Sequence, residues 1–462
     1  MNPPGLLAAF LRITAQWRPL FPQQRSWQRA VQHALGSLVC LGRRCLSRIL
    51  WTNGRQRLPW AADYLFYSRC RWDPQQLFAP ILRQALAYCP GRYVGMAVDD
   101  TRLHKTGRCI VQASYQRDPL SPPFHTNLIL ALRFLQTSLL LPLHRGTHFG
   151  ARALPVRFEE VSVVKKPGKK ADPNAWQQFR LARKLHNLST RFAQNLPILR
   201  TGLDAAGGQK KVLVLAVDGS FCNRTVWGAS APGVELIARS RKDAVLCLPA
   251  PAGTRRFYAA EKFTPEQVRK DDQIPWKTTQ IFYGGKRRTI RYKELCGVLW
   301  QHGAKRRRLR LWVIAPIPYR KRQSARLYYR DPAYLLTSIP QGTPRALLQI
   351  YFDRWQIEVN HREEKDTLGV GQAQMWNPTS VPKQPAFAVA SYSALLLASL
   401  TAFGPGRGEA FAALPKWRRK AKRPSCLDLI TLLRKEMVEH PELTRTFGLK
   451  VTDHDLTSAA AA

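Results

Sequence analysis

The sequence predicts an α/β protein whose N-terminal part is helical. Hydrophobic runs at 93–98 and 211–217 have the composition of β-strands, and an aspartate follows each of them directly. A helix is predicted over 351–365, because Pro344 lies near its start and Gly369 just beyond its end. The 462 residues are enough for a large core and two or three domains.

Residues 1–88 are rich in Arg, Gln and Leu. Segments 25–35 and 74–86 have the apolar spacing of amphipathic helices. We interpret 1–88 as a small basic helical domain. It is suited either to recognising DNA ends or to packing against the core.

The first predicted strand, 93–98, ends at the pair Asp99 and Asp100. Successive strand residues point to opposite faces, so only one of the two aspartates can face a metal site. Apolar runs at 109–115 and 127–134 are predicted to be antiparallel strands that complete a meander.

The clearest strand is 211–217, a continuous apolar run of the kind that is covered on both faces of a sheet. It ends at Asp218, and Gly219 then allows a tight exit. A helix is predicted before this strand, over 174–195. Taken alone, Asp218 would be interpreted as a turn residue after a buried strand, and only the other two acids favour a functional role.

A long stretch of 140 residues separates Asp218 from Glu358 and predicts an insertion over 240–330. Segment 332–338 then leads back to the predicted helix, as either a strand or a loop. The insertion contains four strand-like runs, at 244–248, 279–283, 289–292 and 309–314.

Four side chains of the predicted helix share one face. At about 100° per residue, Tyr351, Arg354, Glu358 and Lys365 fall within a sector of roughly 60°. Such a face suits a helix that meets a phosphate and a divalent metal, since the acid can ligate the metal while the others hold phosphate oxygens. The alternative is an exposed helix with i,i+4 ion pairs such as Arg354–Glu358.

The spacing Tyr-x2-Arg-x3-Glu-x6-Lys resembles the signature of a large group of bacterial insertion-sequence transposases. These are DDE enzymes with an RNase H-like catalytic core, and the Glu is their third acid. Asp100 with Thr101 resembles their first Asp motif, the Asp-Gly-Ser-Phe at 218–221 resembles the second, and a β-rich insertion before the Glu is also similar. The resemblance covers 93–369.

The resemblance implies that Asp100, Asp218 and Glu358 hold two Mg²⁺ ions, for which Mn²⁺ can substitute. One ion activates a water or a DNA 3′-hydroxyl, and the other stabilises the leaving oxygen. Tyr351, Arg354 and Lys365 are then expected to position the phosphate. The enzyme would cut double-stranded transposon ends and join them to target DNA as a homodimer on DNA, in the bacterial cytoplasm and associated with the nucleoid.

The net positive charge of the chain also predicts DNA as the partner. Lys and Arg number 73 against 30 Asp and Glu, a formal net charge of +43 spread along the chain. Such a surplus repels itself in a compact fold and predicts a polyanionic partner, most simply nucleic acid. We expect Lys305, Arg306, Arg307 and Arg308 to contact DNA. The basic runs are Lys165–Lys170, Lys286–Arg288, Lys305–Arg308 and Lys416–Arg423.

The nine cysteines show no metal-binding spacing and are an odd number, which predicts reduced thiols in a cytoplasmic protein. The uncharged stretch 384–405 is interpreted as a helix buried in protein, not as a membrane span. A last helix is predicted over 427–440. The predicted domain plan is a helical domain (1–88), two parts of the RNase H-like core (89–239 and 331–383), the insertion (240–330) and a C-terminal helical region (384–462).

Two other functions fit the same residues. A nuclease of this fold would hydrolyse DNA without strand transfer, and its acids would be the same. A DNA-binding protein derived from a transposase would bind without cutting, although the intact set of three acids argues against it.

Overall fold

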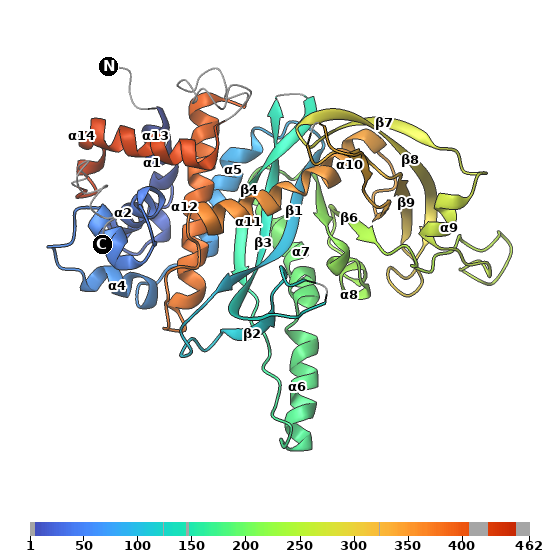
Figure 1. The fold of residues 1–462 in the computed structure, drawn as a ribbon, viewed down its shortest axis with the longest axis horizontal. Coiled ribbons are helices and arrows are strands. Elements are labelled where there is room, and N and C mark those ends of the chain that lie inside the picture. The colour runs from blue at the N-terminus through green and yellow to red at the C-terminus, as the bar shows by residue number, and fades with distance from the viewer. Residues whose placement is uncertain (1–4, 123, 145–146, 323, 406–423, 450–462) are drawn as a thin grey trace.

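The computed structural model describes residues 5–122, 124–144, 147–322, 324–405 and 424–449 (Figure 1). The fold is mixed α/β, built on one ten-stranded mixed sheet of order β2-β3-β1-β5-β6-β12-β9-β8-β7, with β4 also paired to β3. The strands of this sheet are β1 (Tyr93–His104), β2 (Ser114–Arg117), β3 (Leu128–His144), β4 (Thr147–Glu160), β5 (Val212–Val217), β6 (Val234–Ser240), β7 (Lys277–Tyr283), β8 (Lys286–Leu299), β9 (Arg308–Ile314) and β12 (Ala333–Thr337).

The N-terminal part is helical, as its apolar spacing predicts. Its rings pack against a C-terminal helix: Phe66 and Trp72 stack with centroids 5.0 Å apart, and both contact Phe387 of α12 (Ser380–Phe403). The two ends of the chain therefore share one core. The helices before β1 are α1 (Gly5–Ala15), α2 (Gln24–Val39), α3 (Leu46–Thr52), α4 (Ala61–Ser68) and α5 (Phe78–Leu86).

Strand β1 lies in the middle of the first half of the sheet. It pairs antiparallel with β3 and parallel with β5, which in turn pairs parallel with β6. Leu213 to Val217 of β5 are fully buried, so this strand is covered on both faces as its unbroken apolar sequence predicts. β4 runs in the same direction as β1, because each is antiparallel to β3.

The strands of the predicted insertion extend the same sheet. β12 pairs with both β6 and β9, and β8 joins β9 to β7 (Figure 1). The segment left open at 332–338 is thus a strand. The strand predicted at 244–248 is wrong: Leu246 and Cys247 make only isolated bridges, to Phe263 and Leu299.

Three other boundaries differ from prediction. The strand predicted at 109–115 is wrong except for its end, since β2 begins at Ser114. The helix predicted over 174–195 is two helices, α6 (Pro173–Leu185) and α7 (Leu188–Ala205), because Asn187 caps the second one with its side chain. The last predicted helix is α13 (Cys426–Glu439), followed by the short α14 (Pro441–Arg445).

The helix predicted over 351–365 is not continuous. It consists of α10 (Pro344–Asp353), α11 (Gln356–Arg362) and a π-helical turn, Glu363–Thr367. The break and the π-turn depart from the ideal geometry of about 100° per residue on which the predicted face depends.

Helix α12 is, within the described residues, the one helix long and apolar enough to cross a membrane, and 78% of its apolar window is buried inside the protein. It serves as a core helix, consistent with a soluble protein. The basic run Lys416–Arg423 lies outside the described residues.

Candidate active site

Two aspartates are delivered side by side at the end of parallel strands. Val98 of β1 is the register partner of Val217 of β5, so Asp99 and Asp218 are the next residues on neighbouring strands. Adjacent strands lie about 4.8 Å apart, which brings the two carboxylates within interaction range. The Asp218 carboxylate accepts hydrogen bonds from the Ser220 amide (2.9 Å) and hydroxyl (2.7 Å), which fix it at the strand exit.

The alternation of β1 decides which aspartate faces this site. Val94, Met96 and Val98 belong to the large core, whereas Ala97 packs with Ile357 of α11. Asp99 shares the face of Ala97 and therefore points toward the helix. Its Oδ2 lies 3.7 Å from Nη1 of Arg354.

Asp100 points to the other face of β1. Its Oδ2 is 2.9 Å from Nε of Arg133 and 3.7 Å from Nη1 of Arg102. Two arginines thus neutralise this carboxylate away from Asp218. The structure brings Asp99, not the predicted Asp100, to the site that Asp218 shares with the helix.

Glu358 approaches the two aspartates from α11. Its Oε1 lies 3.4 Å from Nη2 of Arg354, which also contacts Asp99. One guanidinium therefore bridges an acid of the strand and the acid of the helix. Burial raises the pKa of Glu358, the Asp218 charge raises it further, and Arg354 opposes both.

The charge of Asp218 raises the pKa of both Asp99 and Glu358, so the three acids interact electrostatically. Burial, followed by the charge of Asp218, raises the pKa of Asp99 to about 7, against the opposing effect of Arg354. When two carboxylates lie close together and partly buried, their mutual repulsion favours the binding of a cation or the protonation of one of them. In the described part of the chain, no three Asp, Glu, His or Cys side chains already enclose an ion-sized space.

The donor set nevertheless fits a hard divalent cation. Asp99 and Glu358 share the Arg354 guanidinium, Asp218 is the neighbour of Asp99 on the next strand, and carboxylate oxygens are the ligands that Mg²⁺ prefers. The positive charge that now compensates Asp99 and Glu358 comes from Arg354, a long side chain that can rotate away.

The other residues of the predicted helical face have different charged neighbours. Tyr351 lies near Arg354, Arg239 and Asp218, and burial raises its pKa. Lys365 sits on the π-turn, where burial lowers its pKa and its charged neighbours include Arg102 and Asp100. The charges of Arg102 and Asp100 thus act on Lys365, whereas those of Arg354 and Asp218 act on Tyr351.

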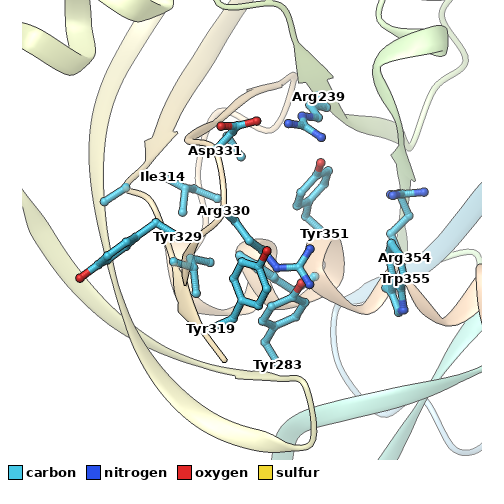
Figure 2. Close-up of a pocket in the computed structure, with 14 residues that line it drawn as sticks. Arg239, Tyr283, Ile314, Tyr319, Tyr329, Arg330, Asp331, Tyr351, Arg354 and Trp355 are labelled. Carbon is cyan, nitrogen blue, oxygen red and sulfur yellow. The ribbon is translucent and has the colours of Figure 1, made fainter. Parts of the chain in front are cut away.

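A pocket of about 480 Å³ opens beside Tyr351 and Arg354. Figure 2 shows the guanidinium groups of Arg239, Arg330 and Arg354 around Tyr351. Rings of Tyr283, Tyr319, Tyr329 and Trp355 line the pocket as well, and Arg330 lies over the first two of these rings at 5.5 and 5.3 Å.

Apart from Tyr351 and Arg354, sequence reasoning missed these pocket residues because they come from segments far apart in the chain: β6, β7, the two-stranded sheet of β10 (Pro318–Tyr319) and β11 (Tyr328–Tyr329), and the residues next to them. A signal for Asp99 was present: Gly95 and Ala97 are small and alternate with the larger Val94, Met96 and Val98. A Cβ on Gly95 would lie 2.9 Å from Ile350, so small residues mark the face on which the helix packs.

The predicted basic group at 305–308 is only partly free. Nη2 of Arg307 lies 3.0 Å from Oε2 of Glu235, and Arg306 lies 5.1 Å from the Phe257 ring centroid. Lys305 and Arg308 are exposed. No family model and no curated protein matches the chain.

Proposed function

We propose that the protein is a metal-dependent DNA transposase of the DDE type. The observation that carries the proposal is the pairing of Asp99 and Asp218 at the ends of parallel strands, with Glu358 facing them from α11. The strand order β4-β3-β1-β5-β6, three antiparallel and then two parallel, is the arrangement expected of an RNase H-like core and supports the same conclusion.

Asp99, Asp218 and Glu358 would hold the two Mg²⁺ ions, with Asp99 taking the place predicted for Asp100. Bound there, the ions activate the attacking water or 3′-hydroxyl and stabilise the leaving oxygen. Arg102 and Arg133 hold Asp100 out of this set.

We expect Arg354 to have one role in the free protein and another when DNA is bound. In the present structure its fork bridges Asp99 and Glu358 and keeps like charges together. In a complex with DNA, the Arg354 guanidinium would be suited to bind two oxygens of the phosphate, a geometry that favours Arg over Lys. The Tyr351 hydroxyl, beside it, donates to the same phosphate.

The arginine- and tyrosine-rich pocket beside the acids is suited to bind the DNA next to the phosphate that is cut. Arg239 and Arg330 can pair with phosphates, and the tyrosine and tryptophan rings offer flat faces to bases. With a net charge of +43, the protein is suited to hold long stretches of duplex. We place it on DNA as a homodimer in the bacterial cytoplasm.

The deciding experiment follows a labelled DNA end. The purified protein is incubated with a labelled 3′-hydroxyl terminus of its element and supercoiled plasmid, with Mg²⁺ or with EDTA. Metal-dependent transfer of label to the plasmid is expected. Cutting without transfer would instead identify the nuclease, and binding with neither would identify a non-enzymatic DNA-binding protein.

A further inference from the structure

A helical arm projects from the edge of the sheet that carries the acids. The arm, residues 162–187, leaves the body after β4, returns along α6 and rejoins the body at α7 (Figure 1). Helix α6 has 13 residues, and none of them is buried. Isolated helices of this length are marginal in water, so a helix held in the open is expected to have a partner.

Both roots of the arm lie beside the proposed active site. Glu160, the last residue of β4, pairs with Phe134, which pairs with Thr101, two residues beyond Asp99. At the returning root, Nδ2 of Asn223 donates to Oγ of Ser189 at 2.8 Å, and Asn223 follows Asp218 by five residues.

The direction of α6 is fixed at its joint with α7. The Asn187 amide donates to the carbonyls of Arg183 (3.2 Å) and Lys184 (2.9 Å), while its oxygen accepts from the Thr190 amide (2.9 Å). The Thr190 hydroxyl donates to the same Lys184 carbonyl at 3.0 Å. Helix α7 is itself anchored by buried apolar residues such as Phe192, so the arm has a firm base.

The charge of the arm selects its partner. Its single acid, Asp172, is used to cap α6 by accepting from the Asn174 amide at 2.7 Å. A second copy of this arm would be repelled, whereas a polyanion would be attracted. The arm carries seven basic residues, all exposed: Lys165, Lys166, Lys169, Lys170, Arg180, Arg183 and Lys184.

The basic residues of α6 also share a face with an aromatic ring. At about 100° per residue, Trp176, Arg180, Arg183 and Lys184 fall within a sector of roughly 100°. Lys166 from the preceding loop lies 5.4 Å from the Trp176 ring centroid, which draws the loop onto the same side.

We propose that this arm binds the backbone of the duplex beyond the phosphate being cut, so that α6 extends the DNA path from the acids. At about 1.5 Å per residue, α6 is roughly 20 Å long, close to six base pairs at about 3.4 Å each. The inference rests on the proposed function, because it takes the partner of the active site to be duplex DNA.

The test variant combines Arg180→Ala, Arg183→Ala and Lys184→Ala. Alanine keeps the helix and none of the three is buried, so far-UV circular dichroism and the unfolding midpoint should not change. Binding of a 40-base-pair duplex is measured at several salt concentrations without Mg²⁺. Affinity at 0.15 M salt should fall at least about tenfold, and the slope of log K against log salt should lessen by about 2.7, or 0.9 per contact.

The control removes the same charge at the other end of the strands. The control residues are exposed and lie away from the acids: Arg83 on α5, Arg92 just before β1 and Lys210 just before β5. Replacing them should change DNA affinity by less than about threefold. Equal losses in the two variants would mean that only net charge matters and would overturn the proposal. The control substitutions are Arg83→Ala, Arg92→Ala and Lys210→Ala.

The outcomes separate this inference from the proposed function. If the parent cuts and transfers DNA while the arm variant binds like the control, the arm inference alone fails. If the parent binds without any metal-dependent cutting and the arm variant is weaker, the arm inference stands and the catalytic proposal fails. A variant with Leu181→Gln and Leu185→Gln, which alters the opposite exposed face of α6, should keep full DNA affinity. If the arm variant with the three alanines binds DNA as the parent does but no longer forms a dimer, the arm is a protein contact instead, and the proposal is overturned.

Discussion

Helix α10 has a pocket on each side, and the two differ in chemistry. The first, about 480 Å³, meets Tyr351 and Arg354 and is rich in arginine and tyrosine. The second, about 460 Å³, meets Ala346 and Ile350 from the opposite face of the helix and is mainly apolar. An acid with a raised pKa lines the apolar pocket, and another, Asp99, contacts Arg354 of the first pocket, so their comparison shows what a raised pKa does and does not indicate.

Asp353 lines the apolar pocket, and burial raises its pKa to about 8. The other groups that act on it are Gln349 and the Ala151 backbone, with no cation among the described residues. Burial is also the largest cause of the raised pKa of Asp99, about 7, but there Asp218 adds a like charge and Arg354 an opposite one. At Asp353 burial raises the pKa with no charged group of the described residues beside it, whereas at Asp99 a like and an opposite charge act as well, which is the arrangement expected where a cation binds.

The largest effect is expected from removing an acid of the proposed site. Asp99→Ala, Asp218→Ala and Glu358→Ala should each lower metal-dependent cleavage at least about a thousandfold, as for members of one catalytic unit. Duplex affinity should change little, because the acids do not bind phosphates directly. Cleavage of a labelled end and gel-shift titration measure the two properties. Normal cleavage by any one variant would remove that residue from the site.

The next effect separates the two neighbouring aspartates. Asp100→Ala should reduce cleavage less than Asp99→Ala, by about tenfold or less, because Asp100 is paired with Arg102 and Arg133 on the other face of β1. Added Mg²⁺ should raise the unfolding midpoint of the Asp100 variant and not that of the Asp99 variant, since only a site that binds the ion gains stability from it. The reverse order would restore Asp100 as the first acid.

Removing the phosphate-binding cations should have an intermediate effect. Arg354→Ala is expected to lower cleavage by about 10²-fold, and Arg354→Lys should recover little of it because the fork is lost. Lys365→Ala should cost less, since Lys365 lies near Asp100 and Arg102. Cleavage rates at saturating DNA provide the measurement, with circular dichroism to check folding. Parental rates in both alanine variants would leave the signature spacing as a structural pattern only.

DNA affinity should depend steeply on salt. A slope equivalent to at least about six phosphate contacts is expected for the parent from titrations of duplex at several salt concentrations. Replacing Lys305, Arg306, Arg307 and Arg308 by alanine should reduce the slope of log K against log salt by the equivalent of fewer than four phosphate contacts, because Arg307 is paired with Glu235. All duplexes should weaken alike, since backbone contacts carry no sequence information. A nearly flat slope in the parent would contradict the view of the protein as one that surrounds DNA.

The sequence predicted the elements with a strong local pattern. β1, β5 and the strands β7 to β9 follow from their apolar runs, and Asp218 directly follows β5, whereas Glu358 on α11 was predicted from the residue spacing of the helix. The pocket could not be predicted, because Arg239 and Arg330 come together only when β6 and the β12 side of the sheet pair. The choice between Asp99 and Asp100 depended on which face of β1 receives the helix, and in the sequence only the small residues Gly95 and Ala97 indicate that face.

The break between α10 and α11 shows the same limit in a helix. The residue spacing from Tyr351 to Lys365 fits one ideal helix, yet the segment is interrupted by a turn at Arg354 and Trp355 and by a π-turn after Arg362 that contains Lys365. Buried Glu364 lies in this π-turn, and its position inside the core is set by β3 and not by helix propensity. Tertiary packing therefore overrode a pattern that was locally self-consistent.

The smallest effect on function is expected from Asp353→Asn. The unfolded chain releases this proton near pH 3.8 and the folded chain only near pH 8. Between these values the folded state binds more protons, so the free energy of unfolding falls as the pH rises through this window. The asparagine variant lacks that loss: it should be more stable than the parent at pH 8, by about 1 kcal/mol or more, and similar at pH 4. Urea unfolding at the two pH values measures this, and DNA cleavage should stay within about twofold of the parent, because Asp353 faces away from the arginine-rich pocket. A large loss of cleavage at unchanged stability would show that the apolar side of α10 also acts on the active site.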